Sequence, residues 1–345
     1  MRNLLLAFDG TWAVPDTELS DGDESTNVWR LVNSLEAVSD EGTEQLSWYF
    51  SGVGTELFDR VRGGLFGHGL SAKIEEGYAS LARHYREGDR VFLSGFSRGA
   101  YTARSLAGMI GRVGLARDPQ LTRQAYELYR EGGAAEQRQF RMYCARQVPI
   151  EAIAVWDTVG ALGVPLGLFD EFNQRYYQFH DTQLGSNVRH AFQALAIDEH
   201  RRSFAPTLWA PQSVPRQTIE QRWFIGAHSD VGGGVHPCPL SSRSLCWIQH
   251  RLHALGLQCR AVEPLSASAL RPTDSWRQFM AGLYALGSER HYRPIGYTRY
   301  GAEVLANAVP DHLNLSDYRP LNPVGMHLPG YHPSRRILSD YRKRA

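Results

Sequence analysis

The sequence predicts an α/β fold, a mainly parallel sheet with helices on both faces. Short apolar runs alternate along the chain with segments whose apolar residues recur at helical spacing. Several of these runs end directly in polar residues, as strands do where their carboxyl ends share a ligand site. A G-x-S-x-G motif at residues 95–99 also lies between an apolar run and a helical pattern, which is typical of a sharp strand-to-helix turn.

Before that motif, the apolar pattern predicts two buried strands and two amphipathic helices. Loops are expected at 13–26 and at 56–70, the second rich in Gly, Phe and Leu. The first strand ends in Asp9-Gly10-Thr11, a polar turn. The expected elements are strand Leu4–Phe8, helix Asn27–Val38, strand Leu46–Phe50 and helix Ala72–Tyr85.

After the motif the alternation continues to about residue 262, beyond which the pattern weakens. We therefore expect a catalytic domain at 1–260 and a C-terminal extension of mixed or irregular structure at 261–345 that packs on the core. A loop carrying several aromatic residues is expected at 161–185. The expected elements are helical segments at 121–147, strand Ile150–Trp156, a helix from Val188 to about Asp198, strand Gln221–Ile225, helix Ser241–Leu255 and a helical segment at 274–286.

Ser97 is the candidate nucleophile, because the motif around it matches the nucleophile elbow of α/β-hydrolase-like folds. Gly95 and Gly99 lack side chains, so the chain can bend tightly and present the Ser97 hydroxyl above the sheet edge. The backbone N–H of Arg98 would then face the position of a developing oxyanion. A serine hydroxyl is a poor nucleophile without an adjacent base.

His228 is the candidate base, because it follows the predicted strand Gln221–Ile225 within a glycine-containing loop. His190 falls on a helix face of the predicted fold and His236 lies beyond the glycines, so both fit less well, and His200 is a further rival.

The acid that orients this histidine is left open between Asp157 and Asp198. Both lie between the serine and the histidine, in the chain order of α/β-hydrolases. Asp157 is slightly favoured because it ends a strand. Either carboxylate could instead cap an element or pair with Arg201 or Arg202.

A second oxyanion donor could come from the turn after the first strand, through Gly10 or Thr11, although a plain turn explains these residues equally well. The main chemical alternative is a divalent metal site formed by Asp9, Asp157 and His228, with Asp230 as a further ligand. No H-x-H or H-E-x-x-H spacing supports it, and no cofactor is expected.

Composition indicates a globular protein whose net charge is too small to create a strong electrostatic field. The 345 residues are 43% apolar and 21% charged, with a net charge of +1, so nucleic acid is not an expected partner. Four sparse cysteines without a C-x-x-C pair suggest reduced thiols and folding in the cytoplasm, with a Cys238–Cys246 or Cys246–Cys259 bridge left open. The first apolar run is too short for a secretion signal, so any delivery would use a signal-peptide-independent system.

Segments spread over residues 1–260 together resemble the signature blocks of the α/β-hydrolase family that includes the class-one phospholipase effectors of bacterial type VI secretion. The resemblance implies a serine hydrolase with Ser97 as nucleophile, His228 as base and an aspartate at 157 or 198. For the effector members it implies phospholipase A activity on membrane lipids. The segments are FDGTW (8–12), NVWRL (27–31), GVGT (52–55), GFSRGAYTAR (95–104), VWDTVGALG (155–163), ALAIDEHRRSFAPTLW (194–209) and WFIGAHSDVGGG (223–234).

Three functions are therefore open. The first is a lipolytic carboxylester hydrolase that meets a membrane surface through the loops 56–70 and 161–185, and that has an immunity or secretion-apparatus protein as partner. The second is a metal-dependent hydrolase or phosphoesterase using Asp9, Asp157 and His228. The third is a non-catalytic binding module of a secretion system, although such a module needs no Ser, His and Asp set.

Overall fold

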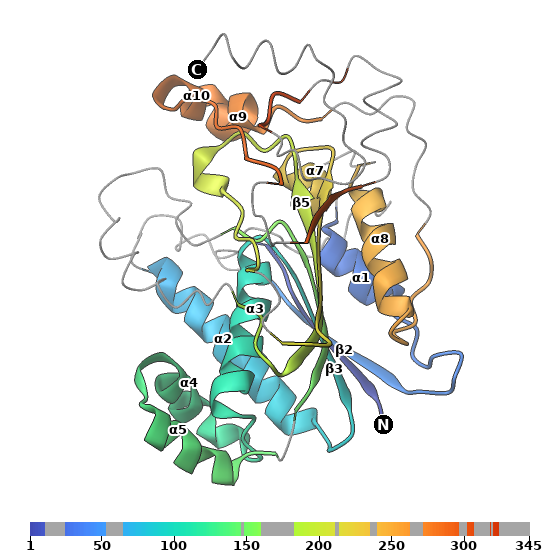
Figure 1. Cartoon of the computed structure of the whole chain (residues 1–345), viewed down its shortest axis with the longest axis vertical. Helices are drawn as coiled ribbons and strands as arrows, with labels where there is room; N and C mark the ends of the chain where they lie inside the picture. The colour runs from blue at the N-terminus through green and yellow to red at the C-terminus, as the bar shows by residue number, and fades with distance from the viewer. Residues whose placement is uncertain are drawn as a thin grey trace.

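At the centre of the part that the structure describes, seven parallel strands form one sheet (Figure 1). This computed structural model describes residues 1–10, 25–52, 65–145, 148–159, 183–210, 214–234, 240–262, 272–296, 302–306, 318 and 320–323. The strands are β1 (Asn3–Phe8), β2 (Gln45–Phe50), β3 (Arg90–Phe96), β4 (Ile150–Trp156), β5 (Val188–Ala196), β6 (Thr218–Phe224) and β7 (Glu303–Leu305). Their order across the sheet is β2-β1-β3-β4-β5-β6-β7, and each neighbouring pair is parallel. The predicted α/β class is confirmed.

Helices cover both faces of this sheet. The helices α1 (Asn27–Ser34) and α8 (Ser241–His253) lie on one face, and α2 (Leu65–His84) and α3 (Arg98–Val113) lie on the other (Figure 1). Thr26 caps the N-terminus of helix α1, because its hydroxyl accepts a hydrogen bond from the N–H of Trp29. The remaining helices are α4 (Thr122–Glu131), α5 (Ala134–Phe140), α7 (His228–Gly232), α9 (Ser275–Gln278) and α10 (Leu283–Gly287), with short 3-10 turns at Pro119–Leu121, Arg141–Tyr143, Arg202–Phe204 and Phe279–Gly282.

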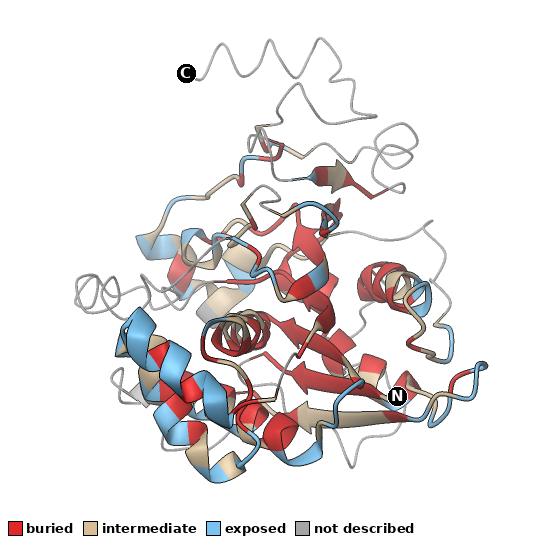
Figure 2. Cartoon of the chain, turned by 60° about the horizontal axis from the view of Figure 1, so that its bottom comes forward, coloured by how far each residue is buried: buried red, intermediate tan, exposed pale blue. Residues whose placement is uncertain are grey.

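Each face of the sheet has its own apolar core, so the strands are buried on both sides (Figure 2). In β1, Leu4, Leu6 and Phe8 belong to the core under α2 and α3, whereas Leu5 and Ala7 belong to the core under α1 and α8. Successive side chains of a strand point to opposite faces. This double burial explains why β1 is an almost unbroken apolar run in the sequence, whereas the less buried β2 and β6 include polar residues.

The prediction of a helix from Val188 to about Asp198 is wrong, because residues 188–196 form strand β5. β5 lies between β4 and β6, and its neighbouring residues Ala191 and Phe192 enter the two opposite cores. A strand buried on both faces carries apolar residues without alternation, and a short run of that kind also satisfies helical spacing. Asp198 therefore follows a strand at the carboxyl edge of the sheet.

Other boundaries shift by a few residues. Helix α2 begins at Leu65, so residues 65–70 of the predicted 56–70 loop are helical, and α1 ends at Ser34, before Val38. Residues 56–64 of that loop and residues 161–182 of the predicted 161–185 loop lie outside the described residues. Strand β7 comes from the 261–345 segment and extends the sheet beside β6.

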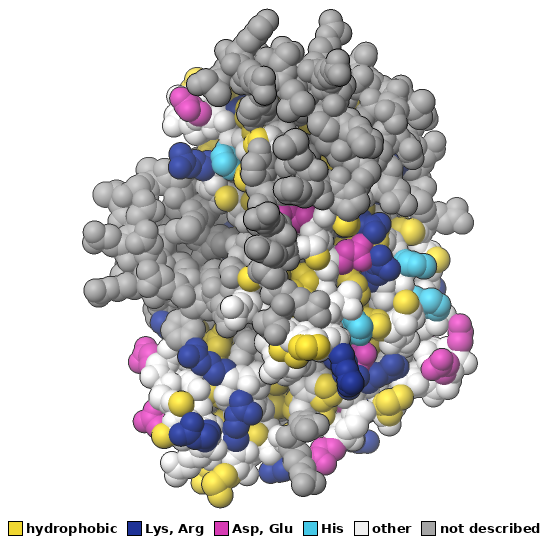
Figure 3. Space-filling model, in the orientation of Figure 1, with side chains coloured by type: hydrophobic (Ala, Val, Ile, Leu, Met, Phe, Trp, Pro, Cys, Tyr) yellow, Lys and Arg dark blue, Asp and Glu magenta, His cyan; other side chains and the backbone are white. Residues whose placement is uncertain are grey.

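The distribution of surface charges, the state of the cysteines and the apolarity of the helices can be compared with what the composition indicates. Basic and acidic side chains of the described residues are interspersed on the face shown in Figure 3. Cys144, Cys246 and Cys259 are free thiols, so a Cys246–Cys259 bridge is not formed, and Cys238 lies outside the described residues. Among the helices of the described residues, none has the length and apolarity needed to cross a bilayer.

Candidate active site

Ser97 lies at a sharp turn between β3 and α3, and its backbone is strained, with φ 58° and ψ −121°. The two flanking glycines are required by close backbone packing. A Cβ atom on Gly95 would lie 2.4 Å from the carbonyl oxygen of Gly99, and one on Gly99 would lie 2.1 Å from the carbonyl oxygen of Phe8. The turn therefore has the tight geometry that the G-x-S-x-G pattern predicts.

His228 comes from the segment after β6 and lies in hydrogen-bond contact with Ser97. It is the first residue of α7, directly after the turn that follows β6, and its Nε2 lies 2.9 Å from Ser97 Oγ. Its ring packs between two aromatic rings, with centroids 4.6 Å from that of Phe96 and 5.1 Å from that of Phe204. Only 7% of Ser97 and 4% of His228 are exposed, so the pair is shielded from bulk solvent.

Asp157 completes a chain of hydrogen bonds through the imidazole. It follows β4, adjacent in the sheet to the strand before Ser97, and its Oδ2 lies 2.5 Å from His228 Nδ1. The carboxylate is fully buried, and its Oδ1 also accepts a hydrogen bond from the N–H of Ala196. The structure thus brings Ser97, His228 and Asp157 together in one row.

A fully buried arginine, Arg293, holds the far side of this carboxylate. Its Nη1 lies 2.7 Å from Asp157 Oδ1 and its Nη2 lies 3.0 Å from Asp157 Oδ2. The same guanidinium donates to the carbonyl oxygens of Ala196 and Phe204. The forked ion pair fixes the plane of the carboxylate that faces His228.

Burial and these partners set the protonation states. Burial alone would raise the pKa of Asp157, but the charge of Arg293 and the hydrogen bond from His228 outweigh it and hold that pKa well below its usual range. Burial lowers the pKa of His228, and the hydrogen bond and charge of Asp157 offset only part of this shift. At neutral pH the imidazole is therefore neutral, with Nδ1–H donating to Asp157 and Nε2 accepting from the Ser97 hydroxyl.

Asp198, the other candidate acid, has different partners. Its carboxylate accepts hydrogen bonds from the N–H of Gly226 and from the hydroxyl of Tyr318. Burial raises the pKa of Asp198 to about 6. Gly226 lies just before α7, so Asp198 holds the backbone segment that leads to His228. The carboxylate that is hydrogen-bonded to the His228 imidazole is that of Asp157.

Two of the three predicted oxyanion donors, Arg98 and Gly10, lie next to Ser97. Arg98 is the first residue of α3, and N–H groups in the first turn of a helix have no acceptor within that helix. A Cβ atom on Gly10 would lie 3.5 Å from Ser97 Cβ, so the turn after β1 passes beside the serine. The N–H of Gly10 donates to the carboxylate of Asp9 at 2.6 Å. Thr11 lies outside the described residues.

The residues of the metal alternative are not assembled as a ligand set. Asp9 is held by the hydroxyls of Thr26 and Tyr49, at 2.5 and 2.7 Å, whereas Asp157 binds Arg293 and His228. Within the described ranges, no group of three or more His, Cys, Asp or Glu side chains could hold a metal ion. The geometry therefore does not favour that alternative.

The remaining candidates are placed apart from the imidazole–serine contact. His190 lies on β5, and its ring stacks near Phe192. His200 contacts the carbonyl oxygen of His291, and His236 lies outside the described residues. Asp230 accepts hydrogen bonds from the N–H of Ala227 and from the N–H and hydroxyl of Thr273, so it holds the loop around His228 in place.

Sequence reasoning missed two buried charges beside this site, Arg293 and Glu199. Glu199 pairs with Arg201 at 2.7 Å and accepts the backbone N–H of His228 at 3.3 Å. The Glu199-x-Arg201 spacing was a visible signal for a local ion pair. Arg293 had no such signal, because it lies among Pro, His and Tyr residues far from Asp157 in the chain.

Comparison with known proteins assigns the family. Residues 2–251 match the sequence model of the family described as T6SS, phospholipase effector Tle1-like, catalytic domain. The chain belongs to this family. Arg293 lies beyond the matched residues, so a side chain outside the family match contacts Asp157.

Individual relatives are more distant. The chain is 28% identical over 240 residues to the uncharacterized protein YEL023C of Saccharomyces cerevisiae, covering 61% of this chain and 33% of that protein. A crystal structure of an uncharacterized protein from Pseudomonas aeruginosa is similar at 19% identity with a TM-score of 0.44, covering 75% of this chain and 46% of the other. The Tle1 effector bound to the VgrG spike of the type VI secretion system is similar at 18% identity with a TM-score of 0.41, covering 68% and 51%. The chain thus spans about half of these solved chains and a third of the yeast protein.

Proposed function

We propose that this chain is a serine carboxylester hydrolase of the phospholipase A type, with Ser97 as nucleophile, His228 as base and Asp157 as the acid. The observation that carries the proposal is the row of hydrogen bonds from Ser97 Oγ to His228 Nε2 at 2.9 Å and from His228 Nδ1 to Asp157 Oδ2 at 2.5 Å. Nucleophile, base and orienting group are recognised by this mutual geometry. Membership of the Tle1-like family supports a phospholipid as the ester.

In the first half of the proposed reaction, Ser97 Oγ attacks the ester carbonyl carbon while its proton passes to His228 Nε2. The carbonyl π electrons move to oxygen, and the N–H of Arg98 stabilises the oxyanion. For the Gly10 N–H to act as the second donor, it would have to leave the Asp9 carboxylate that it binds in this structure. Collapse of this intermediate breaks the ester C–O bond. The imidazolium returns its proton to the leaving alcohol, which departs as a lysophospholipid.

In the second half, a water molecule attacks the acyl group on Ser97, and His228 takes the proton of that water. The fatty acid leaves and the Ser97 hydroxyl is restored. Asp157 stays ionised throughout and stabilises the imidazolium, because Arg293 keeps the pKa of this carboxyl low. Arg293 is thus a positioning residue, which acts on the reaction through Asp157.

Labelling with a fluorophosphonate probe tests the nucleophile directly. The probe is expected to modify the wild-type chain at Ser97, as mapped by mass spectrometry, and to leave Ser97→Ala unmodified. A lipid-class screen is expected to show fatty acid release from phospholipids by the wild type, with a loss of about 10⁴-fold or more in Ser97→Ala. A Ser97→Ala protein that cleaves the same lipids at the wild-type rate would contradict the proposal.

Two further outcomes separate the alternatives. Hydrolysis that chelators abolish and that the phosphonate leaves intact would favour a metal-dependent hydrolase. A folded chain that neither reacts with the probe nor cleaves esters would favour a binding module.

The effector role itself predicts that the wild type, directed to the periplasm of a bacterium, stops growth and that Ser97→Ala does not. An immunity protein or a component of the secretion apparatus is the partner that this role implies.

A further inference from the structure

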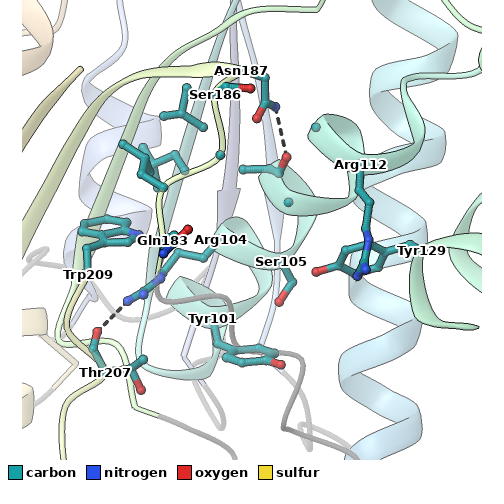
Figure 4. A pocket seen from close by; sticks show the side chains of 17 residues that line it. Tyr101, Arg104, Ser105, Arg112, Tyr129, Gln183, Ser186, Asn187, Thr207 and Trp209 are labelled. Atoms are coloured by element: carbon teal, nitrogen blue, oxygen red, sulfur yellow. Dashed lines mark hydrogen bonds between the residues drawn. The ribbon is translucent and has the colours of Figure 1, made fainter. Parts of the chain in front are cut away.

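A cavity of about 370 Å³ lies along α3, starting one helical turn beyond Ser97 (Figure 4). Its first lining residue is Tyr101, whose backbone N–H donates to the carbonyl oxygen of Ser97. The side chains of Tyr101, Arg104 and Ser105 line it from α3. The segment before β5 and the segment around Trp209 form the opposite wall. The volume is within the range of small-molecule sites.

Arg104 carries a positive charge into this cavity without an acidic partner in the described part of the chain. Its Nη1 donates to the carbonyl oxygen of Thr207 at 2.6 Å, and its guanidinium lies 4.4 Å from the centroid of the Trp209 ring. Burial lowers the pKa of Arg104, and Tyr101 offsets part of this shift. A guanidinium keeps its proton at neutral pH even so, so the charge remains.

Arg104 is half-buried, and the two arginines that are buried in the described part of the chain, Arg201 and Arg293, are neutralised. Arg201 pairs with Glu199 and Arg293 pairs with Asp157, each at 2.7 Å and each with a buried carboxylate. Burying a cation without a counter-charge is costly, and one carbonyl group with one aromatic face compensates a guanidinium only in part. Unlike Arg201 and Arg293, Arg104 therefore has no carboxylate partner among the described residues.

The rest of the lining is also suited to an anion. Among the described residues that line the cavity there is no Asp or Glu, whereas a second guanidinium, that of Arg112, is present. Hydroxyl groups of Tyr101, Ser105 and Tyr129 add further hydrogen-bonding groups around the space. Donors that approach from α3, from α4 and from the opposite wall match the several oxygens of a phosphate better than the two oxygens of a carboxylate.

We propose that this cavity binds the phosphate group of a phosphate ester, with Arg104 as the central ligand. The proposal goes beyond the function proposed above and does not depend on Ser97 acting as a nucleophile. A phosphate of this kind can come from a phospholipid headgroup or from a soluble phosphate ester. Arg104 lies two helical turns, roughly 10 Å, from Ser97 along α3, so both sources fit the position.

Titration of sn-glycerol 3-phosphate into the full chain, followed by calorimetry and by thermal unfolding, tests the site. The wild type is expected to bind it and to unfold at a higher temperature with it than with glycerol. Arg104→Met is expected to weaken binding at least tenfold, and Arg104→Lys, which keeps the charge and loses the fork, to fall between the two. Arg138→Met, at an exposed position of α5, is the matched control and should bind as the wild type does.

The unliganded variants separate a ligand site from a structural role. If Arg104 serves a ligand site, Arg104→Met should unfold near the wild-type temperature when no phosphate ester is present. Addition of sn-glycerol 3-phosphate should then not raise the unfolding temperature of this variant. A structural role predicts a lower unfolding temperature and an unchanged shift. Equal affinity in Arg104→Met and Arg138→Met, a stronger shift with octanoate than with the phosphate ester, or no binding by the wild type would overturn the proposal.

Hydrolysis kinetics then identify the source of the phosphate. If the cavity holds a lipid headgroup, Arg104→Met raises KM for short-chain phosphatidylglycerol and leaves KM for p-nitrophenyl butyrate unchanged. If it holds a soluble ester, sn-glycerol 3-phosphate binds through Arg104 and neither KM changes. Should the wild type hydrolyse neither ester, the hydrolase proposal fails while the calorimetric result still decides the phosphate site.

Discussion

Arg293 and Asp157 form a bidentate ion pair, although they lie 136 residues apart in the chain, and both side chains are fully buried. The arginine comes from the C-terminal segment, beyond residues 2–251 that match the Tle1-like family. The aspartate lies at the carboxyl edge of the central sheet, against His228. This pair therefore ties the C-terminal segment to the proposed chemistry.

Removal of Arg293 is expected to cost both stability and activity. Arg293→Met leaves a buried carboxylate without its cation, which typically destabilises a protein by about 3–5 kcal/mol. The pKa of Asp157 then rises, so the acidic limb of the kcat/KM profile moves to higher pH. Urea unfolding and pH–rate profiles measure the two effects. Arg293→Lys should recover part of each, and Arg277→Met, whose side chain is 74% exposed, should change neither. An unaltered acidic limb in Arg293→Met would show that Arg293 has only a structural role.

Substitution of the two candidate acids is expected to separate their roles. Asp157→Asn removes the charge that stabilises the imidazolium, and the expected loss in kcat is about 10³- to 10⁴-fold. Asp198→Asn keeps a hydrogen-bond acceptor for Gly226 and should lose less than about tenfold, or 1.4 kcal/mol in activation free energy. Steady-state kinetics on a soluble ester measure both. The reverse ranking would transfer the role of the acid to Asp198.

The activity of the wild type should rise with pH through the pKa of His228. Only the neutral imidazole can accept the Ser97 proton, and burial holds the pKa of His228 below its ordinary value of about 6.5. Activity is thus lost as the pH falls and histidine becomes protonated, with the midpoint of kcat/KM below pH 6.5. A soluble ester and constant ionic strength keep lipid ionisation out of the profile. A midpoint above pH 7 would contradict the assignment of His228 as a buried neutral base.

A methyl group at Gly10 is expected to disturb the serine while the fold is retained. In Gly10→Ala the new Cβ would lie 3.0 Å from Phe96 Cδ1 and 3.5 Å from Ser97 Cβ. A shift of that order at the nucleophile and the oxyanion turn should lower kcat/KM by about 10- to 100-fold. Gly287→Ala is the control, because a Cβ there meets nothing within 4 Å. Equal activity of the two variants would remove Gly10 from the oxyanion turn.

Asp198 should also make stability depend on pH. Its pKa of about 6 in the folded state is above the unfolded value of 3.8, so its contribution to stability is fully present below pH 3.8 and is lost as the pH rises through 6. Asp198→Asn removes this loss, so the variant should gain on the order of 3 kcal/mol relative to the wild type between pH 4 and pH 7. Denaturant unfolding at both pH values measures the difference, with the exposed Asp40→Asn as control. A constant difference between the two proteins would contradict the raised pKa.

Much of this architecture could be predicted from local sequence. Strands β1, β2, β4 and β6 and the turn at Ser97 were recognisable, because a short run rich in apolar residues and a glycine-flanked serine are constraints that act within a few residues. β5 was not recognisable, since burial on both faces makes its pattern identical to that of a buried helix.

The sequence by itself determined the class of fold and brought Ser97, His228 and Asp157 forward as candidates, because each directly follows an apolar run that ends at one edge of the sheet. Only the tertiary structure decided which aspartate touches the imidazole, since Asp157 and Asp198 satisfy the same chain order and differ in where their strands end. It also decided the partners of Arg293 and Arg104. A buried charge is defined by what folds against it, and no local pattern records contacts between residues more than a hundred positions apart.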